Sequence, residues 1–262
     1  MRNRSEMTVV EHLTELRLVL LKIFVAIAIG SVVVFLFGED MLNFITRVSE
    51  PSFITNRWLC RLAVLLSSPD LCINSNPISF TNIELAGQFT LHIRLAVFGG
   101  VVVSAPYCFA VIAGFISPAL KDGERKVSVK FIIASAVLFL VGITFGYLVI
   151  APIAVHFLAY YTISAAVLNQ ITIQSFISTV IQTILAMGLG FELPLVVYFL
   201  NKWHIVEVDF LKRKRPVAFV VILTLAAIIT PPDVFSMVIV ALPLWLLYEL
   251  GIIATNHIKN RD

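Results

Sequence analysis

The chain has 262 residues, of which 59% are hydrophobic and only 13% are charged, and its mean hydropathy is +0.97. A soluble protein of this length would have too little polar surface to cover itself, so the composition excludes that class. The net charge is only +3, and because there is no long basic tract, nothing suggests nucleic acid as a partner. We therefore predict an all-α polytopic membrane protein, with residues 1–262 forming one domain in the lipid bilayer.

Six apolar segments follow one another along the chain. Runs of about 18 or more apolar residues with few charges are typical of transmembrane helices. The first run is too long for the apolar region of a signal peptide, and Gly38-Glu39-Asp40 after it is not a small-residue cleavage site, so we expect no cleavable signal. The six predicted spans are 18–37, 94–116, 127–151, 176–200, 217–229 and 234–254.

The N-terminal sequence VVEHLTELRLVLLK has an amphipathic helical pattern. Glu11 and Glu15 are one helical turn apart on one face. The pattern predicts a short interfacial helix that leads into the first span. Glu15 is either a solvated carboxylate or part of a binding site, and the pattern alone is compatible with both. The apolar residues of the other face are Val9, Leu13, Leu16 and Leu20.

The first outer loop, about 38–93, is long and contains two of the three cysteines. Cys60 and Cys72 lie in this loop, whereas Cys108 lies inside the second span. In an oxidising periplasm the two loop cysteines could form a disulfide, or they could be two unpaired thiols. Their spacing does not distinguish these alternatives, and no metal-ligand pattern accompanies them.

The connection between the second and third spans reads FISPALKDGERK. Phe115 and Pro118 end the second span, and Glu124 lies in the loop. An acidic residue in a loop is common, but Glu124 is expected on the same membrane face as Glu15. Two exposed carboxylates on one face could each bind a guanidinium group through forked hydrogen bonds.

The fourth span contains an acidic residue, Glu192, well inside the sequence AMGLGFELPLVVYFL. An ionisable group at that depth costs several kcal/mol unless it is paired or hydrated. Glu192 is therefore either protonated and hydrogen-bonded to a neighbouring helix, or a functional group in a wet cavity. Pro194 predicts a bend here, and Gly188 and Gly190 predict the close approach of another segment.

The last two predicted spans are unusually short. Val217 to Ile229 is 13 residues, about 20 Å of helix, and Val234 to Tyr248 is 15 residues, about 22 Å, against a hydrocarbon core of about 30 Å. Either the polar ends snorkel, or the bilayer thins or admits water beside them. Between them, Pro231 and Pro232 block helix continuation, and Asp233 can cap the next helix.

Basic residues predict the orientation in the membrane, because lysine and arginine favour cytoplasmic loops. Of the 19 lysines and arginines, 15 fall on one side if both termini share that side. We therefore expect both termini in the cytoplasm. The cytoplasmic set is Arg2, Arg4, Arg17, Lys22, Lys121, Arg125, Lys126, Lys130, Lys202, Lys212, Arg213, Lys214, Arg215, Lys259 and Arg261.

Catalytic and nucleotide-binding motifs are absent from the sequence. It contains no H-E-x-x-H, G-x-S-x-G, P-loop or G-x-G-x-x-G pattern, and its five histidines are scattered. We predict that the protein is not an enzyme and that it binds neither a cofactor nor a metal.

Six motifs, in order, resemble those of the TatC family, and the resemblance covers nearly the whole chain. The family is the polytopic receptor subunit of the twin-arginine, or Sec-independent, protein translocase. The motifs are HLTELR (12–17), FISPALKDGERK (115–126), GITFGYLVIAPIAVHFL (142–158), FELP (191–194), KRKRP (212–216), and TPPDVFS with LPLWLLYE (230–236 and 242–249).

The resemblance implies a cupped, concave six-helix bundle in the bacterial cytoplasmic (inner) membrane. It also implies that the chain binds Arg-Arg signal peptides at the cytoplasmic face and supports export of folded proteins, driven by the proton-motive force. The implied partners are small single-span subunits of the TatA and TatB type, with self-association in a larger complex. By position, Glu15 and Glu124 would contact the two arginines, and Arg17, Phe115 and Pro118 would shape that site.

The resemblance also implies roles on the other membrane side and within the bilayer. Glu192 would lie in the concave cavity, and Pro231, Pro232 and Asp233 would form the outer tip of the last hairpin, where a partner subunit makes contact. Two departures leave the docking chemistry open: Met237 replaces a polar glutamine, and residues 110–113 lack the family's Y-Q-x-W.

A second function is compatible with the residues alone. In a proton-coupled small-molecule transporter, Glu192 would carry the proton. Such transporters often contain internal repeats and broken helices near the midplane, whereas this sequence has one helix interrupted by proline and no repeat.

Overall fold

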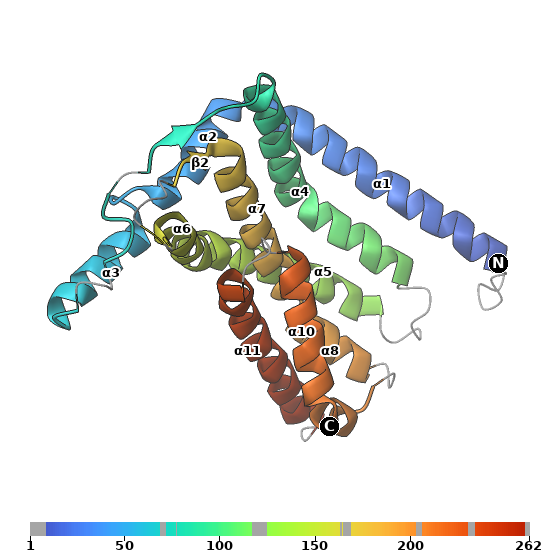
Figure 1. The fold of residues 1–262 in the computed structure, drawn as a ribbon. Helices are drawn as coiled ribbons and strands as arrows, with labels where there is room; N and C mark the ends of the chain where they lie inside the picture. Colours follow the sequence, from blue (N-terminus) through green and yellow to red (C-terminus); the bar gives the residue numbers. More distant parts are fainter. Residues whose placement is uncertain are drawn as a thin grey trace. The chain divides into compact units, whose positions relative to one another are not determined.

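The computed structural model describes residues 9–68, 72–76, 78–116, 125–162, 164, 169–202, 206–229 and 234–259. Most of these residues are helical (Figure 1). The described strands form one small parallel pair, in which β1 (Phe80–Thr81) lies beside β2 (Ile171–Thr172) with Phe80 opposite Ile171. The predicted all-α character is thus confirmed apart from this short pair.

Four helices in the described part of the chain are long and apolar enough to cross a membrane. They coincide with the first four predicted spans, and two shorter apolar helices coincide with the fifth and sixth. The long stretches are Leu13–Phe35, Gly87–Phe115, Ile132–Tyr160 and Ile173–Asn201, and the shorter ones are Arg215–Ala227 and Met237–Ile253.

The chain divides into two compact units, and each is described by itself. Unit 1 consists of Met1–Met41 and Phe89–Val137. It contains α1 (Val9–Phe35), the start of α2 (Gly38–Thr46), nearly all of α4 (Gly87–Ile116) and the first part of α5 (Arg125–Phe145). The N-terminal amphipathic segment is continuous with the first span, because α1 runs unbroken from Val9: the first glycine is Gly30, and no proline precedes it to stop propagation.

Unit 2 consists of Leu42–Gln88 and Leu138–Asp262. Its first spanning helix combines the end of α5 with the π-helical turn η5 (Gly146–Ile150) and α6 (Ala151–Tyr160). The predicted end at residue 151 is therefore wrong by about nine residues. Pro152 has no N–H for the Leu148 carbonyl, but the Thr55 hydroxyl donates a hydrogen bond to that carbonyl, so the helix continues past the proline.

The fourth span is two helices, α7 (Ile173–Gly190) and α8 (Leu193–Lys202), with a turn at residues 191–192. This break confirms the bend predicted from Pro194. After the short α9 (Val208–Arg213) come α10 (Arg215–Ile229) and α11 (Val234–Lys259).

The helix α11 is 26 residues long and extends beyond Tyr248, but its apolar stretch, Met237–Ile253, is shorter than the first four spans, in agreement with the predicted short sixth span. Glu249 lies within α11 and forms an ion pair with Arg215 at 2.6 Å. The 15 residues of α10 likewise agree with the predicted short fifth helix. The buried core of this region consists of Ile150, Ala186, Met187, Val197, Val208, Ile222, Ala226, Val240, Ala241, Leu244, Tyr248 and Ile252.

The described part of the first outer loop is mainly helical. It contains the 3-10 turn η1 (Arg47–Ser49) and α3 (Ile54–Leu65). Cys60 and Cys72 form a disulfide, which settles the alternative that their spacing left open, and Cys108 is a free cysteine inside α4.

Candidate functional site

The structure describes four of the predicted site residues. Glu15, Arg17 and Phe115 belong to unit 1, and Glu192 belongs to unit 2. The others lie outside the described residues: Glu124, Pro118, Pro231, Pro232 and Asp233.

Unit 1 is built around a crossing of α1 and α4 that only small residues permit. A Cβ atom added to Gly100 would lie 2.6 Å from the backbone nitrogen and 2.8 Å from the Cα of Ser31. One added to Gly30 would lie 3.0 Å from the Gly100 carbonyl oxygen. The two backbones therefore touch directly, as in helix pairs that associate through small residues in membranes. This crossing was not predicted from the sequence, although the pairs Gly30-Ser31 and Gly99-Gly100 were its visible signal.

The C-terminal end of α1 is fixed to α4 by a histidine. The carbonyl of Phe35 accepts a hydrogen bond of 2.8 Å from Nε2 of His92, so this ring nitrogen must carry the proton. The two rings also stack, with centroids 3.9 Å apart. A helix leaves its last carbonyls without intrahelical donors, and His92 satisfies one of them.

Glu15 and Phe115 lie toward the other end of this helix pair. The helices are antiparallel, because Gly30 meets Gly100 whereas Phe35 meets His92. Glu15 and Phe115 are each 15 positions from the crossing, about 22 Å along their helices. They therefore share one end of unit 1, where α1 and α4 diverge (Figure 1).

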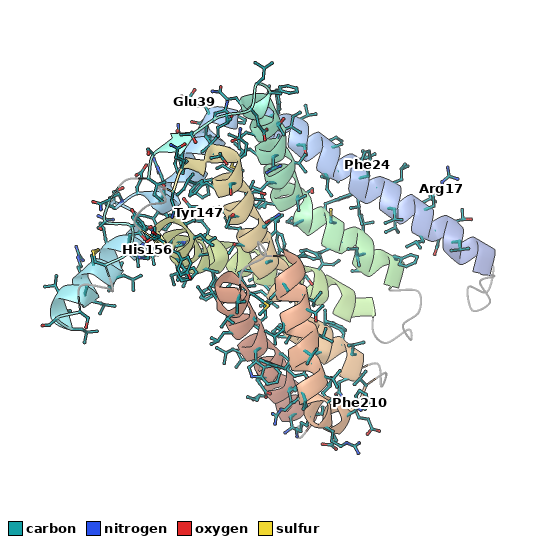
Figure 2. The ribbon with its side chains drawn as sticks, in the orientation of Figure 1. Arg17, Phe24, Glu39, Tyr147, His156 and Phe210 are labelled. Carbon is teal, nitrogen blue, oxygen red and sulfur yellow. A yellow bond between two sulfur atoms is a disulfide. The ribbon has the colours of Figure 1, made fainter. Side chains whose placement is uncertain are left out.

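The predicted residues differ in exposure at that end. Glu15 and Phe115 are partly buried, whereas Arg17 is exposed. Arg17 projects from α1 on the side away from α4 (Figure 2). Since residues two positions apart do not face each other on a helix, Glu15 and Arg17 occupy different faces of α1.

In unit 2, Glu192 lies in the turn between α7 and α8. The backbone N–H of Glu192 donates to the Leu189 carbonyl at 3.1 Å, and its own carbonyl accepts from Val196 at 2.9 Å. Pro194 has no N–H and so removes the donor for the Gly190 carbonyl. The proline thus explains why the helix breaks at the acidic residue.

The residues on both sides of Glu192 contact other helices. A Cβ atom on Gly190 would overlap Leu244 of α11, and one on Gly251 of α11 would lie 2.9 Å from the Cα of Pro194. These two contacts show that the segment from the end of α7 into α8 runs parallel to α11. On another face, the Phe191 ring lies 5.6 Å from the ring of Phe145 in α5.

A glycine crossing also joins α5 to α7, as Gly188 had predicted. A Cβ on Gly142 would lie 2.5 Å from the Met187 carbonyl oxygen and 2.9 Å from the Cα of Gly188. The backbone that carries Glu192 is therefore fixed from two sides by close contacts. Its side chain is partly buried, and the helical neighbours of its face, Leu189 and Val196, are 59% and 48% exposed. Because Oε1 of Glu192 is nevertheless buried, this side chain lies at the border between the interior of unit 2 and an exposed surface.

Near the start of α10, polar contacts that were not predicted from the sequence join α11 to α10 and to α9. Arg215 donates to Glu249 at 2.6 Å, and the Tyr248 hydroxyl donates to the Leu211 carbonyl at 3.0 Å. Arg215 and Glu249 are 34 positions apart, so no local pattern could reveal the pair. It fixes the register in which α10 and α11 run antiparallel.

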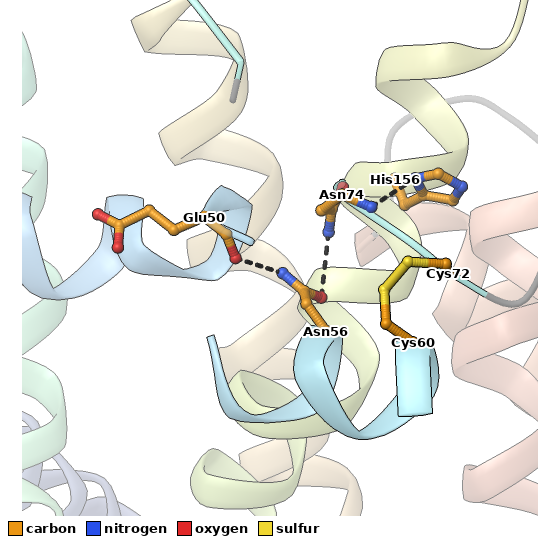
Figure 3. Close-up of a disulfide and its surroundings, with 6 residues drawn as sticks. All are labelled: Glu50, Asn56, Cys60, Cys72, Asn74 and His156. Atoms are coloured by element: carbon orange, nitrogen blue, oxygen red, sulfur yellow. Dashed lines mark hydrogen bonds between the residues drawn. A yellow bond between two sulfur atoms is a disulfide. The ribbon is translucent and has the colours of Figure 1, made fainter. Parts of the chain in front are cut away.

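A buried polar network holds the outer loop to α6 (Figure 3). The side-chain nitrogen of Asn56 donates to the carbonyls of Val48 and Glu50, at 3.1 and 2.7 Å. The side-chain nitrogen of Asn74 donates to Oδ1 of Asn56 at 3.3 Å and to the Pro152 carbonyl at 3.2 Å.

The backbone of Asn74 also contributes, because its N–H donates to Nδ1 of His156 at 3.1 Å. Asn74 has a φ of 50°, a left-handed conformation that asparagine tolerates better than most residues. Within the part of the chain that the structure describes, three or more His, Cys, Asp or Glu residues do not come together in a group able to hold a metal ion.

Comparison with known proteins gives a consistent family match. The model of the family described as Sec-independent protein translocase protein (TatC) matches residues 11–243. The chain is 32% identical over 261 residues to the TatC protein of Blattabacterium sp. subsp. Periplaneta americana (strain BPLAN), covering 98% of each chain. It is 30% identical over 245 residues to the TatC protein of Escherichia coli (strain K12), covering 93% of this chain and 86% of that one.

Solved structures agree with the sequence matches. A crystal structure of the twin arginine translocase receptor TatC has a TM-score of 0.75 and 26% sequence identity to this chain. The match covers 94% of this chain and 98% of the crystallised one. A second crystal structure of the same receptor, in DDM, has a TM-score of 0.76.

Proposed function

This chain belongs to the TatC family of Sec-independent protein translocase proteins, and we propose from that premise that it binds Arg-Arg signal peptides at the cytoplasmic face of the bacterial inner membrane. It supports export of folded proteins, driven by the proton-motive force. It acts with small single-span subunits of the TatA and TatB type and with further copies of itself. The observation that carries the proposal is the match, over 94% of the chain, to structures of the twin arginine translocase receptor.

Transport rather than catalysis is the role that the relatives' names state. The proposed chemistry is the recognition of two guanidinium groups by two carboxylates. Glu15 supplies one carboxylate from α1, and Glu124 supplies the other from the connection after α4. A carboxylate can accept both parallel N–H groups of a guanidinium, which lysine cannot offer. This difference gives the selectivity for Arg-Arg over Lys-Lys.

The position of Glu15 supports this assignment. It lies away from the α1–α4 crossing, at the end that also carries Phe115, where the helices diverge. Phe115, with Pro118, forms the apolar side of the site, and Arg17 balances the charge of the carboxylates.

The remaining proposed roles lie in and beyond the bilayer. Glu192, at the border between the interior of unit 2 and an exposed surface, faces a hydrated cavity of the cupped six-helix bundle. Pro231, Pro232 and Asp233 form the outer tip of the α10–α11 hairpin and contact a single-span partner subunit. Hydration explains how an acid is tolerated at this depth.

The proposed orientation has both termini in the cytoplasm and the first loop in the periplasm. It follows from the 15 basic residues that this topology puts on the inner side. With α10 only 15 residues long, about 22 Å, the bilayer thins beside the hairpin because its hydrocarbon core is normally about 30 Å thick.

Charge reversal tests the receptor site. In the double variant Glu15→Lys, Glu124→Lys, export of a twin-arginine reporter should stop while the chain still inserts in the membrane. Removing one carboxylate alone should weaken signal-peptide binding roughly tenfold to a hundredfold, because a hydrogen bond to a charged group contributes about 1.5–3 kcal/mol.

The matched control is Glu39→Lys, the same charge change on an exposed acid at the opposite end of α1. It should leave export intact. Photocrosslinking from positions 15 and 124 to an Arg-Arg peptide, compared with a Lys-Lys peptide, reports binding directly. Normal export by the double variant would disprove the site assignment.

A further inference from the structure

The outer-loop helix α3 has an apolar face that the described residues do not cover. Its buried face contains Asn56 and Ala63. Opposite lies a stripe, spaced at one helical turn, whose residues we call the α3 stripe. Its members are Ile54 (47% exposed), Trp58 (61%), Leu62 (42%) and Leu65 (79%).

Charge is segregated on the same helix. Arg57 and Arg61, both exposed, are one turn apart along one edge of the α3 stripe. The sequence ITNRWLCRLAVL contains no acidic residue. A tryptophan and leucines on one face with arginines beside them are typical of a helix that lies in a membrane interface.

The stripe is held rigidly, so its exposure is not that of a loose loop. Asn56 anchors α3 to the carbonyls of Val48 and Glu50, and the disulfide ties Cys60 to Cys72 one turn further on (Figure 3). The segment after Cys72 is itself bound to α6 through Asn74. The stripe therefore keeps its orientation relative to the spanning helix.

The depth of α3 follows from its contact with that helix. The Thr55 hydroxyl donates to the carbonyl of Leu148, and Leu148 lies inside the apolar stretch Ile132–Tyr160. Leu148 is 12 positions before Tyr160, about 18 Å along the helix. The start of α3 therefore lies alongside this apolar helix rather than beyond its end.

We propose that α3 is an interfacial helix whose stripe inserts into the leaflet on the side of the first loop, while Arg57 and Arg61 bind lipid phosphates. The α3 stripe contacts the bilayer rather than a protein, because the apolar residues and the arginines lie on separate parts of α3. Such a separation matches the acyl chains and the headgroups of a leaflet. The binding is stronger to an anionic surface, where each arginine adds electrostatic attraction. This inference goes beyond signal-peptide recognition and does not depend on it.

Tryptophan quenching tests the proposal on the full chain. The protein has three tryptophans, and the variant Trp203→Phe, Trp245→Phe leaves Trp58 alone. The variant is reconstituted in vesicles of phosphatidylcholine and phosphatidylglycerol that carry bromine at a shallow or a deep acyl position. Trp58 should lose most of its emission to shallow bromines, less to deep ones, and should be protected from aqueous iodide.

The matched control retains Trp245 of α11 and replaces Trp58 and Trp203 by phenylalanine, which gives the response of a residue on a spanning helix. Quenching of Trp58 by iodide but not by bromolipid would overturn the proposal. Protection from both would also overturn it, since a protein partner or a second copy would then cover the stripe.

The arginines are tested separately. The double variant Arg57→Gln, Arg61→Gln is made in the protein that retains only Trp58, which serves as the parent. In anionic vesicles, shallow bromines should quench Trp58 of the double variant only as much as they quench Trp58 of the parent in vesicles of phosphatidylcholine alone. Added salt should have the same effect on the parent, because it screens the headgroup charge. If the vesicle composition makes no difference to the parent, the phosphate contact is wrong.

Discussion

At the scale of single residues, helix crossings in both units depend on glycine. Gly100 brings the backbone of α4 onto that of α1, and Gly142 brings α5 onto the carbonyl of Met187 in α7. In a membrane the hydrophobic effect does not drive helices together, so close packing between such small residues supplies much of the association energy. A single methyl group at these positions must move a backbone rather than a flexible side chain.

We expect Gly100→Ala to destabilise the protein. The new methyl would overlap the backbone of Ser31, and overpacking costs about 1–3 kcal/mol, which exceeds the gain in helix propensity of about 1 kcal/mol. Gly114→Ala, in the same helix, is the matched control because its Cβ would meet nothing within 4 Å. Thermal unfolding in detergent should show a lower midpoint for Gly100→Ala only, and equal shifts for both would contradict the crossing.

At the scale of helices, hydropathy predicted where the spans lie but not where they end. The first four spans and the two shorter helices fall where the apolar runs predicted them. Some of their ends differ because contacts distant in sequence act on them: Thr55 donates to the Leu148 carbonyl, which Pro152 leaves without its usual donor. The same holds for the site. The local sequence predicted the helix break at Glu192 from Pro194, whereas the contacts with α11 around it result from tertiary packing and were not predicted.

The hairpin of α10 and α11 should tolerate a change of composition but not of length. Four leucines inserted in each arm, between the Arg215–Glu249 pair and the turn, would extend it by about 6 Å toward a normal bilayer thickness. Both arms must be lengthened to keep the ion pair in register. We expect normal membrane insertion and loss of reporter export, measured by cell fractionation.

The control for the hairpin replaces Val217, Val220 and Val221 by leucine. These side chains of α10 are exposed, so the substitutions increase apolar content without changing length. Export should be retained in this control. Unchanged export by the lengthened hairpin would mean that its shortness, and the thinning inferred from it, has no part in transport.

At the scale of the whole molecule, the topology combines two independent signals. The basic residues favour a cytoplasmic location for both termini, and the disulfide of the first loop favours an oxidising compartment for the opposite side. The two signals agree, because an odd number of crossings separates the N-terminus from the first loop. Since that loop also supports α6 through Asn74 and Thr55, its correct location is a condition for the fold of unit 2.

The redox state of the loop cysteines therefore reports on topology in living cells. In a Cys108→Ser background, thiols are blocked under denaturing conditions, the protein is reduced, and a maleimide polymer is added. We expect two polymers per chain, since Cys60 and Cys72 are protected as a disulfide until reduction. In Cys60→Ala the remaining thiol is blocked at the first step, so polymer should not attach. Suppose that the Cys108→Ser protein binds no polymer. If external protease also removes a C-terminal tag, the proposed orientation is wrong. If the tag is protected, the result shows only that the disulfide does not form.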